Sequence, residues 1–247
     1  MNTTHKITFL ILLLLFGCSN TPKLDANKNA TDLVILVHGF AKSGRVMKTF
    51  AYEFQNAGYQ TCVLNYTSLG VSNNALTEQT GMQINSCLTQ SENAQNVHFV
   101  GHSLGGLLIR HYLQEDHALI DEKRLGRVVM IGTPNHGSKV ADHYAEKFWI
   151  HWLGEIPLSL TTSERAFSNK LNEPSYNVGV IAGTKGYQWT SKYFDERNDG
   201  LVSVDSAKLP LMDDYYEVSF SHHQLRSDPI VTSLVLSYIT HGVFVKT

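Results

Sequence analysis

The chain has 247 residues, and its 20 Lys and Arg against 22 Asp and Glu give a formal net charge of −2 at neutral pH. The sequence has no basic cluster, so it carries no electrostatic footprint for nucleic acid. Once a short leader is set aside, about 230 residues remain, enough for one sizeable α/β core but not for two full domains.

The N-terminus predicts an export signal. Lys6 precedes an almost wholly apolar run from Ile7 to Phe16. That run is too short to span a bilayer as a helix, which takes about 20 apolar residues, but it suits the core of a signal peptide. We therefore predict that residues 1–17 form a signal peptide and are removed.

The end of this leader, Leu15-Phe16-Gly17-Cys18, resembles the bacterial lipobox, in which the cysteine is lipidated and begins the mature protein. Phe16 is bulkier than the usual residue there, so a soluble periplasmic protein or an uncleaved anchor remains an alternative. Ser19 after the cysteine is typical of lipoproteins sent to the outer membrane. We expect Cys18 to anchor the protein in the bacterial cell envelope, facing the periplasm, with residues 18–31 as lipidated N-terminus and flexible tether.

Residues 32–247 predict one domain in which strands and helices alternate. Strand-like runs rich in β-branched or aromatic residues cover 33–37, 60–66, 97–100, 127–131, 178–182 and 215–219. Helical patterns cover 46–57, 75–90, 104–114 and 229–240. The alternation predicts an α/β fold with a mostly parallel central sheet, helices on both of its faces, and right-handed crossovers.

Cys62 and Cys87 remain once Cys18 is assigned to the lipid. In an oxidising periplasm such an even pair can form a disulfide. Cys62 lies in a strand-like run and Cys87 in a helical one, and the sequence does not give their separation. Two buried free thiols are therefore the alternative.

The nucleophile signature is Gly101-His102-Ser103-Leu104-Gly105, between the apolar run 97–100 and the helical pattern 104–114. This is the strand-turn-helix context of a nucleophile elbow, in which a tight turn exposes the serine hydroxyl at a helix N-terminus. Ser103 is therefore the predicted nucleophile. Its amide neighbour Leu104 is one expected oxyanion donor, and Phe40, in the loop after the first strand, is the other.

A serine needs a general base and an acid that orients the base. The base is expected after the last strand, where His222 and His223 are adjacent. The acid is expected after the strand before it, and Asp199 in the turn-rich segment 197–203 fits best. Asp195 and Asp205 are the alternatives, and any of these aspartates could simply cap a turn.

The sequence resembles the α/β-hydrolases of the lipase and esterase type over residues 33–244. The resemblance rests on five motifs in the family's order: His38-Gly39-Phe40, Gly101 to Gly106, Gly132-Thr133-Pro134-Asn135-His136-Gly137-Ser138, Asn198-Asp199-Gly200-Leu201-Val202, and Ser221-His222. It implies Ser103 as nucleophile, Asp199 as acid and, because the family's base follows a serine, His222 over His223. The doubled histidine leaves the base ambiguous, and the extra N-terminal strands of larger members are lacking.

The apolar segment 140–172, with two tryptophans, is predicted to be a small cap or lid over the site, although core packing would also explain it. The resemblance implies a lipase-like or carboxylesterase-like serine hydrolase that acts on a small-molecule or lipid ester. An acyltransferase or thioesterase on the same residues and an inactive hydrolase-fold interaction protein are alternatives. No cofactor is expected, and no metal site, because the histidines are scattered.

Overall fold

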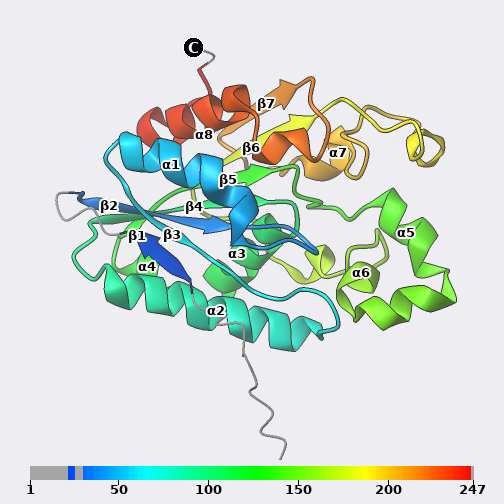
Figure 1. Ribbon diagram of the computed structural model, residues 1–247, viewed down its shortest axis with the longest axis horizontal. Coiled ribbons are helices and arrows are strands. Elements are labelled where there is room, and N and C mark those ends of the chain that lie inside the picture. Colours follow the sequence, from blue (N-terminus) through cyan, green and yellow to red (C-terminus); the bar gives the residue numbers. More distant parts are fainter. Residues whose placement is uncertain (1–21, 26–29, 246–247) are drawn as a thin grey trace, which may run out of the picture.

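We describe residues 22–25 and 30–245 of the protein in a computed structural model (Figure 1). Seven strands form one sheet in the order β1-β3-β2-β4-β5-β6-β7, and every neighbouring pair except β1 with β3 is parallel. The strands are β1 (Lys23–Asp25), β2 (Asp32–Val37), β3 (Gln60–Val63), β4 (Asn96–His102), β5 (Leu125–Ile131), β6 (Val178–Gly183) and β7 (Asp214–Val218). The predicted mostly parallel α/β sheet is confirmed.

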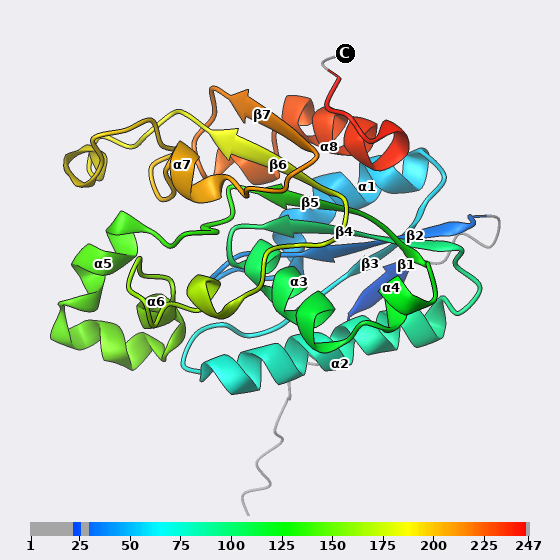
Figure 2. The ribbon, with the colours of Figure 1, turned by 180° about the vertical axis from the view of Figure 1, so that it is seen from behind.

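Four long helices flank the sheet. They are α1 (Lys48–Asn56), α2 (Asn73–Gln90), α3 (Leu104–Glu115) and α8 (Pro229–His241). Figures 1 and 2 show α1 and α8 on one face of the sheet and α2 and α3 on the other. The shorter helices are η1 (Gly44–Met47), α4 (Ala118–Asp121), α5 (Lys139–Ala145), η2 (Phe148–Leu153), α6 (Ile156–Ser159), η3 (Ser168–Lys170), η4 (Ser191–Tyr193), α7 (Val204–Ala207) and η5 (Gln224–Arg226).

The alternation of side chains along the strands builds one hydrophobic core on each face of the sheet. In β2, Val34 and Leu36 pack in the core shared with α1 and α8, whereas Leu33 and Ile35 pack in the core shared with α2 and α3. Successive residues of a strand point to opposite faces, so a strand buried on both faces is apolar throughout. This explains the continuous apolar runs of the sequence.

Two details of the sheet differ from the sequence expectations. The strand expected at 60–66 ends at Val63, because Asn65 turns away to bond with Gln83 of α2 through its backbone amide and carbonyl, at 2.8 and 3.0 Å. Strand β1 was not predicted. It lies within the expected tether and pairs antiparallel with β3, from Lys23 opposite Val63 to Asp25 opposite Thr61.

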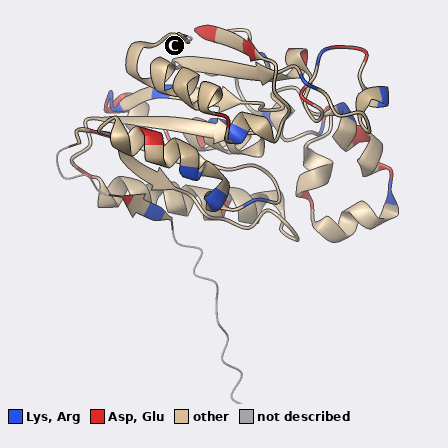
Figure 3. Cartoon of the chain, turned by 45° about the horizontal axis from the view of Figure 1, so that its top comes forward, with Lys and Arg blue, Asp and Glu red and all other residues tan. Residues whose placement is uncertain are grey.

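The leader 1–17 and Cys18 lie outside the described residues. Within the part of the chain that is described, no helix has both the length and the apolar character needed to cross a bilayer. Basic and acidic residues are interspersed along the ribbon (Figure 3).

Cys62 of β3 and Cys87 of α2 form a disulfide, with an S–S distance of 2.06 Å and a Cα–Cα distance of 6.0 Å. Both side chains are fully buried in the core between the sheet and α2. The bridge closes a loop across a sequence separation of 25 residues and so restricts the unfolded chain.

Replacing both cysteines by alanine is expected to lower the free energy of unfolding by about 3 kcal/mol, from the loop-entropy relation for a cross-link of this span. Urea denaturation of the two proteins under oxidising conditions measures the difference. A decrease in the free energy of unfolding of less than about 1 kcal/mol would show that the disulfide adds little stability by restricting the unfolded chain.

Candidate active site

Ser103 occupies the sharp turn between β4 and α3. Its backbone adopts φ 55° and ψ −126°, a conformation that costs a non-glycine residue about 1–3 kcal/mol and persists only where the surroundings enforce it. Two glycines make the turn possible: a Cβ on Gly101 would approach the amide nitrogen of Gly106 to 2.6 Å, and one on Gly105 would collide with the carbonyl oxygen of Val37. The strained turn has the strand-turn-helix geometry that a nucleophile elbow requires.

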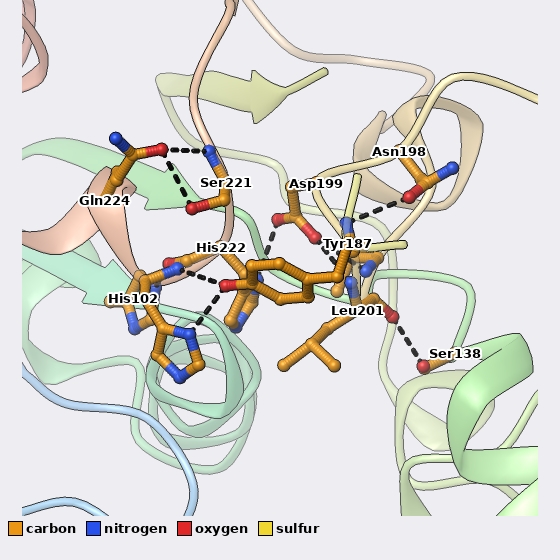
Figure 4. Close-up of polar contacts among 12 residues, drawn as sticks. His102, Ser138, Tyr187, Asn198, Asp199, Leu201, Ser221, His222 and Gln224 are labelled. Carbon is orange, nitrogen blue, oxygen red and sulfur yellow. Dashed lines mark hydrogen bonds and ion pairs between the residues drawn. The ribbon is translucent and has the colours of Figure 1, made fainter. Parts of the chain in front are cut away.

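His222 follows β7 and is held by Asp199, which follows β6. The Nδ1 atom of His222 lies 2.7 Å from Oδ2 of Asp199, and the backbone amide of His222 donates to the Asp199 carbonyl at 2.8 Å (Figure 4). Asp199 and His222 are 1% and 4% exposed. Because Nδ1 is engaged, Nε2 is the ring nitrogen of His222 that can accept a proton.

Asp199 also has the turn-capping role that the sequence left open. Its Oδ1 accepts hydrogen bonds from the amides of Leu201 and Val202, at 2.9 and 2.8 Å. One carboxylate oxygen therefore fixes the turn and the other orients the histidine, which locks the carboxylate in place. The alternatives Asp195 and Asp205 are exposed, and Asp205 pairs with Lys208.

His223 has a different partner. Its Nδ1 lies 2.6 Å from the Tyr187 hydroxyl, and the same hydroxyl accepts from the His223 amide at 3.1 Å. No hydrogen bond joins His223 to Asp199 among the described residues. The structure thus distinguishes the two adjacent histidines by their partners, whereas the sequence favoured His222 only through the family resemblance.

The amides of Phe40 and Leu104 are free to donate. In the described part of the chain, neither amide donates a hydrogen bond to another group. The Phe40 loop is fixed from two sides. The Ala41 amide donates to Ser68 Oγ at 2.9 Å, and the fully buried His38 stacks on Tyr66 at a centroid distance of 3.9 Å.

His102, the variable residue of the elbow motif, was not singled out from the sequence. It is buried, and its Nε2–H donates to the backbone carbonyl of His222 at 3.0 Å. The elbow and the histidine loop are therefore linked by a direct hydrogen bond. His102 is a positioning residue, which nothing in the sequence pattern signalled.

Ser103, His222 and His223 line one cavity of about 450 Å³. Most of its wall is apolar, and about half of the lining residues come from the segment 134–160: Pro134, Ser138, Val140, Ala141, Tyr144, Trp149, Ile150, Leu153, Pro157 and Leu160. Figures 1 and 2 show α5 and α6 of this segment at one end of the molecule, beside the carboxyl ends of the strands. The segment expected as a cap is therefore part of the wall of the candidate site.

The Gly132 to Ser138 motif builds that wall. Asn135 bonds to Arg110 of α3 at 3.0 Å and to the Ala207 carbonyl at 2.8 Å, and Ser138 Oγ donates to the Leu201 carbonyl at 2.6 Å. These bonds tie the motif to α3 and to the segment after Asp199, so it supports the wall of the cavity.

Comparison with known proteins gives the family. The sequence model described as alpha/beta hydrolase fold matches residues 32–176, more than half of the chain. The chain belongs to the α/β-hydrolase family. It is 29% identical over 154 residues to a triacylglycerol lipase from Pseudomonas fragi. The aligned region covers 60% of this chain and 50% of the lipase. The chain thus matches about half the length of that curated relative.

Solved structures share the fold of this α/β-hydrolase at low sequence identity. A mature lipase from Bacillus licheniformis has a TM-score of 0.70 and 18% identity, over 92% of this chain and 100% of the lipase. An esterase from Thermogutta terrifontis has a TM-score of 0.58 and 12% identity, over 89% of this chain and 92% of the esterase.

Several cavity residues of this α/β-hydrolase were missed from the sequence. Lys42, Trp189 and Arg226 line the cavity, and Tyr187 stacks on Trp189 at a centroid distance of 5.7 Å. They come from loops after three different strands, where no periodic pattern marks a residue's direction. In the described residues, no group of three or more His, Cys, Asp or Glu side chains is arranged to hold a metal ion.

The buried histidines of this α/β-hydrolase predict a loss of stability in acid. Burial lowers the pKa of His38 to about 4 and the pKa of His102 well below its ordinary value. Between pH 6.5 and 4 the unfolded chain binds protons at these sites and the folded chain does not. The free energy of unfolding should therefore decrease as the pH is lowered through this window, by about 1.4 kcal/mol per pH unit for each such histidine.

Urea denaturation at several pH values from 7 to 4.5 tests this. His38→Gln should reduce the slope of the free energy of unfolding against pH, whereas His136→Gln, at an exposed position, serves as the matched control. An unchanged slope in His38→Gln would contradict the assignment.

Proposed function

We propose that this protein is a serine hydrolase that cleaves carboxylic esters through a Ser103, His222 and Asp199 triad. The observation that carries the proposal is the buried bond between His222 and Asp199, on a histidine that shares one cavity with the elbow serine. The lipase and esterase neighbours of the same fold support the choice of esters.

In the first half of the reaction, His222 Nε2 takes the proton of the Ser103 hydroxyl as Oγ attacks the ester carbonyl. The negative charge that develops on the carbonyl oxygen is stabilised by the amides of Phe40 and Leu104. When the tetrahedral intermediate collapses, His222 returns the proton to the leaving alcohol, and an acyl-enzyme ester on Ser103 remains.

In the second half, His222 takes a proton from a water molecule, which attacks the acyl-enzyme. The products are a carboxylic acid and free Ser103, so protons and electrons balance without a cofactor. Asp199 holds the imidazole in one orientation and stabilises its positive charge in both halves. No hydrogen bond joins Ser103 to His222 in the described structure, and such bonds often tighten only when substrate binds.

The wall of the cavity supports an acyl chain as the group that is bound. Leu153, Pro157, Leu160 and the ring of Trp149 surround a space of about 450 Å³, in the range of small-molecule sites. Outside the cavity, the cap exposes Phe148 and Trp152 to 76% and 78%. We propose lipid or other acyl esters as the substrate class.

A lipid anchor on Cys18 would hold this site at a membrane surface of the bacterial cell envelope. This part of the proposal rests on the lipobox-like leader. Incorporation of labelled palmitate that is lost in Cys18→Ser would support it, and equal labelling of both proteins would overturn it.

The test of the proposed function is a series of 4-nitrophenyl esters of graded acyl length, together with labelling by a fluorophosphonate that reacts with activated serines. Hydrolysis and labelling that both require Ser103 would support the proposal. A peak at long chains would indicate a lipase-like pocket, and a peak at acetate or butyrate would indicate an esterase. Added alcohols or thiols that outcompete water for the acyl group would indicate a transferase instead. A protein that neither reacts nor hydrolyses would be an inactive member of the fold.

A further inference from the structure

The candidate active site contains two cationic side chains that form no ion pair within the described part of the chain. Lys42, in the loop that carries Phe40, and Arg226, at the end of η5, both line the cavity of Ser103. The ion pairs among the described residues include neither of them. Arg226 Nη1 is a buried atom with no hydrogen-bond partner.

An unpaired buried guanidinium nitrogen is costly, because a charged donor removed from water loses its hydration without compensation. Such groups usually have a partner in native proteins. Here no acidic residue is found among the described residues that line the cavity. The fully buried Asp199 is the acid of the site, and both of its oxygens are occupied by His222 and by the amides of its own turn.

The two cations line the same cavity as His223 and act on its pKa. Burial lowers the pKa of His223, repulsion from Arg226, His222 and Lys42 lowers it further, and the Asp199 carboxylate partly offsets this shift. Burial also lowers the pKa of Arg226 itself. Arg226 and Lys42 therefore both act electrostatically on His223. Asp199 is the carboxylate that opposes them, and its oxygens are already occupied by His222 and by the amides of its own turn.

We propose that Arg226, assisted by Lys42, binds an anionic oxygen group of the substrate, a carboxylate or a phosphate, close to the ester that Ser103 attacks. This inference rests on the proposed ester hydrolysis and narrows its substrates to esters that carry a negative charge beside the scissile bond. The planar guanidinium presents several donors to such a group, and a charge-assisted bond in a partly buried site is stronger than a neutral one. The apolar wall from the cap would then hold the acyl chain, and the cations would fix its orientation.

Two matched pairs of substrates test the proposal. The first pair is 4-nitrophenyl hydrogen glutarate and its uncharged isostere 4-nitrophenyl 5-methylhexanoate, which differ by a carboxylate on the acyl side. The second pair is 1-hexanoylglycerol 3-phosphate and 1-hexanoylglycerol, which differ by a phosphate on the leaving group. The measured quantity is the ratio of kcat/KM for the charged ester to that for the uncharged ester, because general damage to the enzyme cancels in it.

In at least one pair, Arg226→Gln is expected to lower this ratio about tenfold, and Lys42→Gln to lower it less. Arg226→Lys, which keeps the charge, should retain most of the preference, and added salt should reduce the preference of the wild-type protein. Arg165→Gln removes an exposed arginine that does not line the cavity and is the matched control. A ratio unchanged within about twofold by Arg226→Gln in both pairs, with hydrolysis of the uncharged esters still dependent on Ser103, would overturn the proposal and leave the proposed function intact.

A binding measurement decides the case in which no ester is hydrolysed. Isothermal titration of the Ser103→Ala protein with 1-hexanoylglycerol 3-phosphate and with 1-hexanoylglycerol needs no turnover. Tighter binding of the phosphate that is lost when Arg226→Gln is added would support the anion site even if the proposed hydrolysis failed. Equal affinity for the phosphate ester with and without Arg226 would overturn it.

Discussion

The Ser103→Ala variant is expected to lose at least about 10⁴-fold in kcat for a 4-nitrophenyl ester, because removing the nucleophile of a serine hydrolase leaves only the residual catalysis of the oxyanion donors and of binding. Alanine removes only the hydroxyl oxygen and keeps the Cβ, so the strained turn at φ 55° is preserved. The fold should therefore survive. Steady-state kinetics beside a thermal melt of both proteins measure the two effects.

The matched control is Ser86→Ala, on helix α2 away from the cavity, where the serine accepts a hydrogen bond from Gln90. Its activity should match that of the wild-type protein. Retained activity in Ser103→Ala would show that another group performs the attack, and it would end the assignment of the elbow serine.

His222→Ala is expected to lower kcat about as far as Ser103→Ala, because nucleophile and base act as a unit and the loss of either disables both. His223→Ala should cost about tenfold or less, because His223 contacts Tyr187 rather than Asp199 and is not bonded to the acid. Parallel kinetics of the two single variants on one ester measure the difference directly.

Asp199→Asn extends the same experiment. Loss of the carboxylate should lower kcat by up to about 10⁴-fold, because the imidazole would lose the acceptor that fixes its tautomer. Equal losses in His222→Ala and His223→Ala would contradict the assignment of a single base. A larger loss in His223→Ala would move the role to that histidine and require a rearranged Asp199.

The strands and long helices could be predicted from the sequence because each has its own local pattern. The continuous apolar runs predicted six of the seven strands, and the glycines around Ser103 predicted the elbow because no other residue fits that turn. Strand β1 has only three residues with little to bury, so its pairing with β3 depends on an edge that the rest of the chain creates. No local pattern marks such a strand.

The residues of the site divide in the same way, into those marked by a local sequence pattern and those placed by contacts with distant parts of the chain. Gly101 to Gly105 determine the turn at Ser103 through short-range sterics, which the order of residues already contains. The choice of His222 over His223, the bond from His102 to the histidine loop, and the unpaired Arg226 in the cavity depend on loops that follow different strands. The sheet brings these loops to one edge, and the direction of each side chain there follows from packing against partners distant in the sequence. The sequence alone thus determined the fold class, the elbow and the candidates for the triad, and only the tertiary structure decided which partners meet, because those contacts exist only after the strands have assembled.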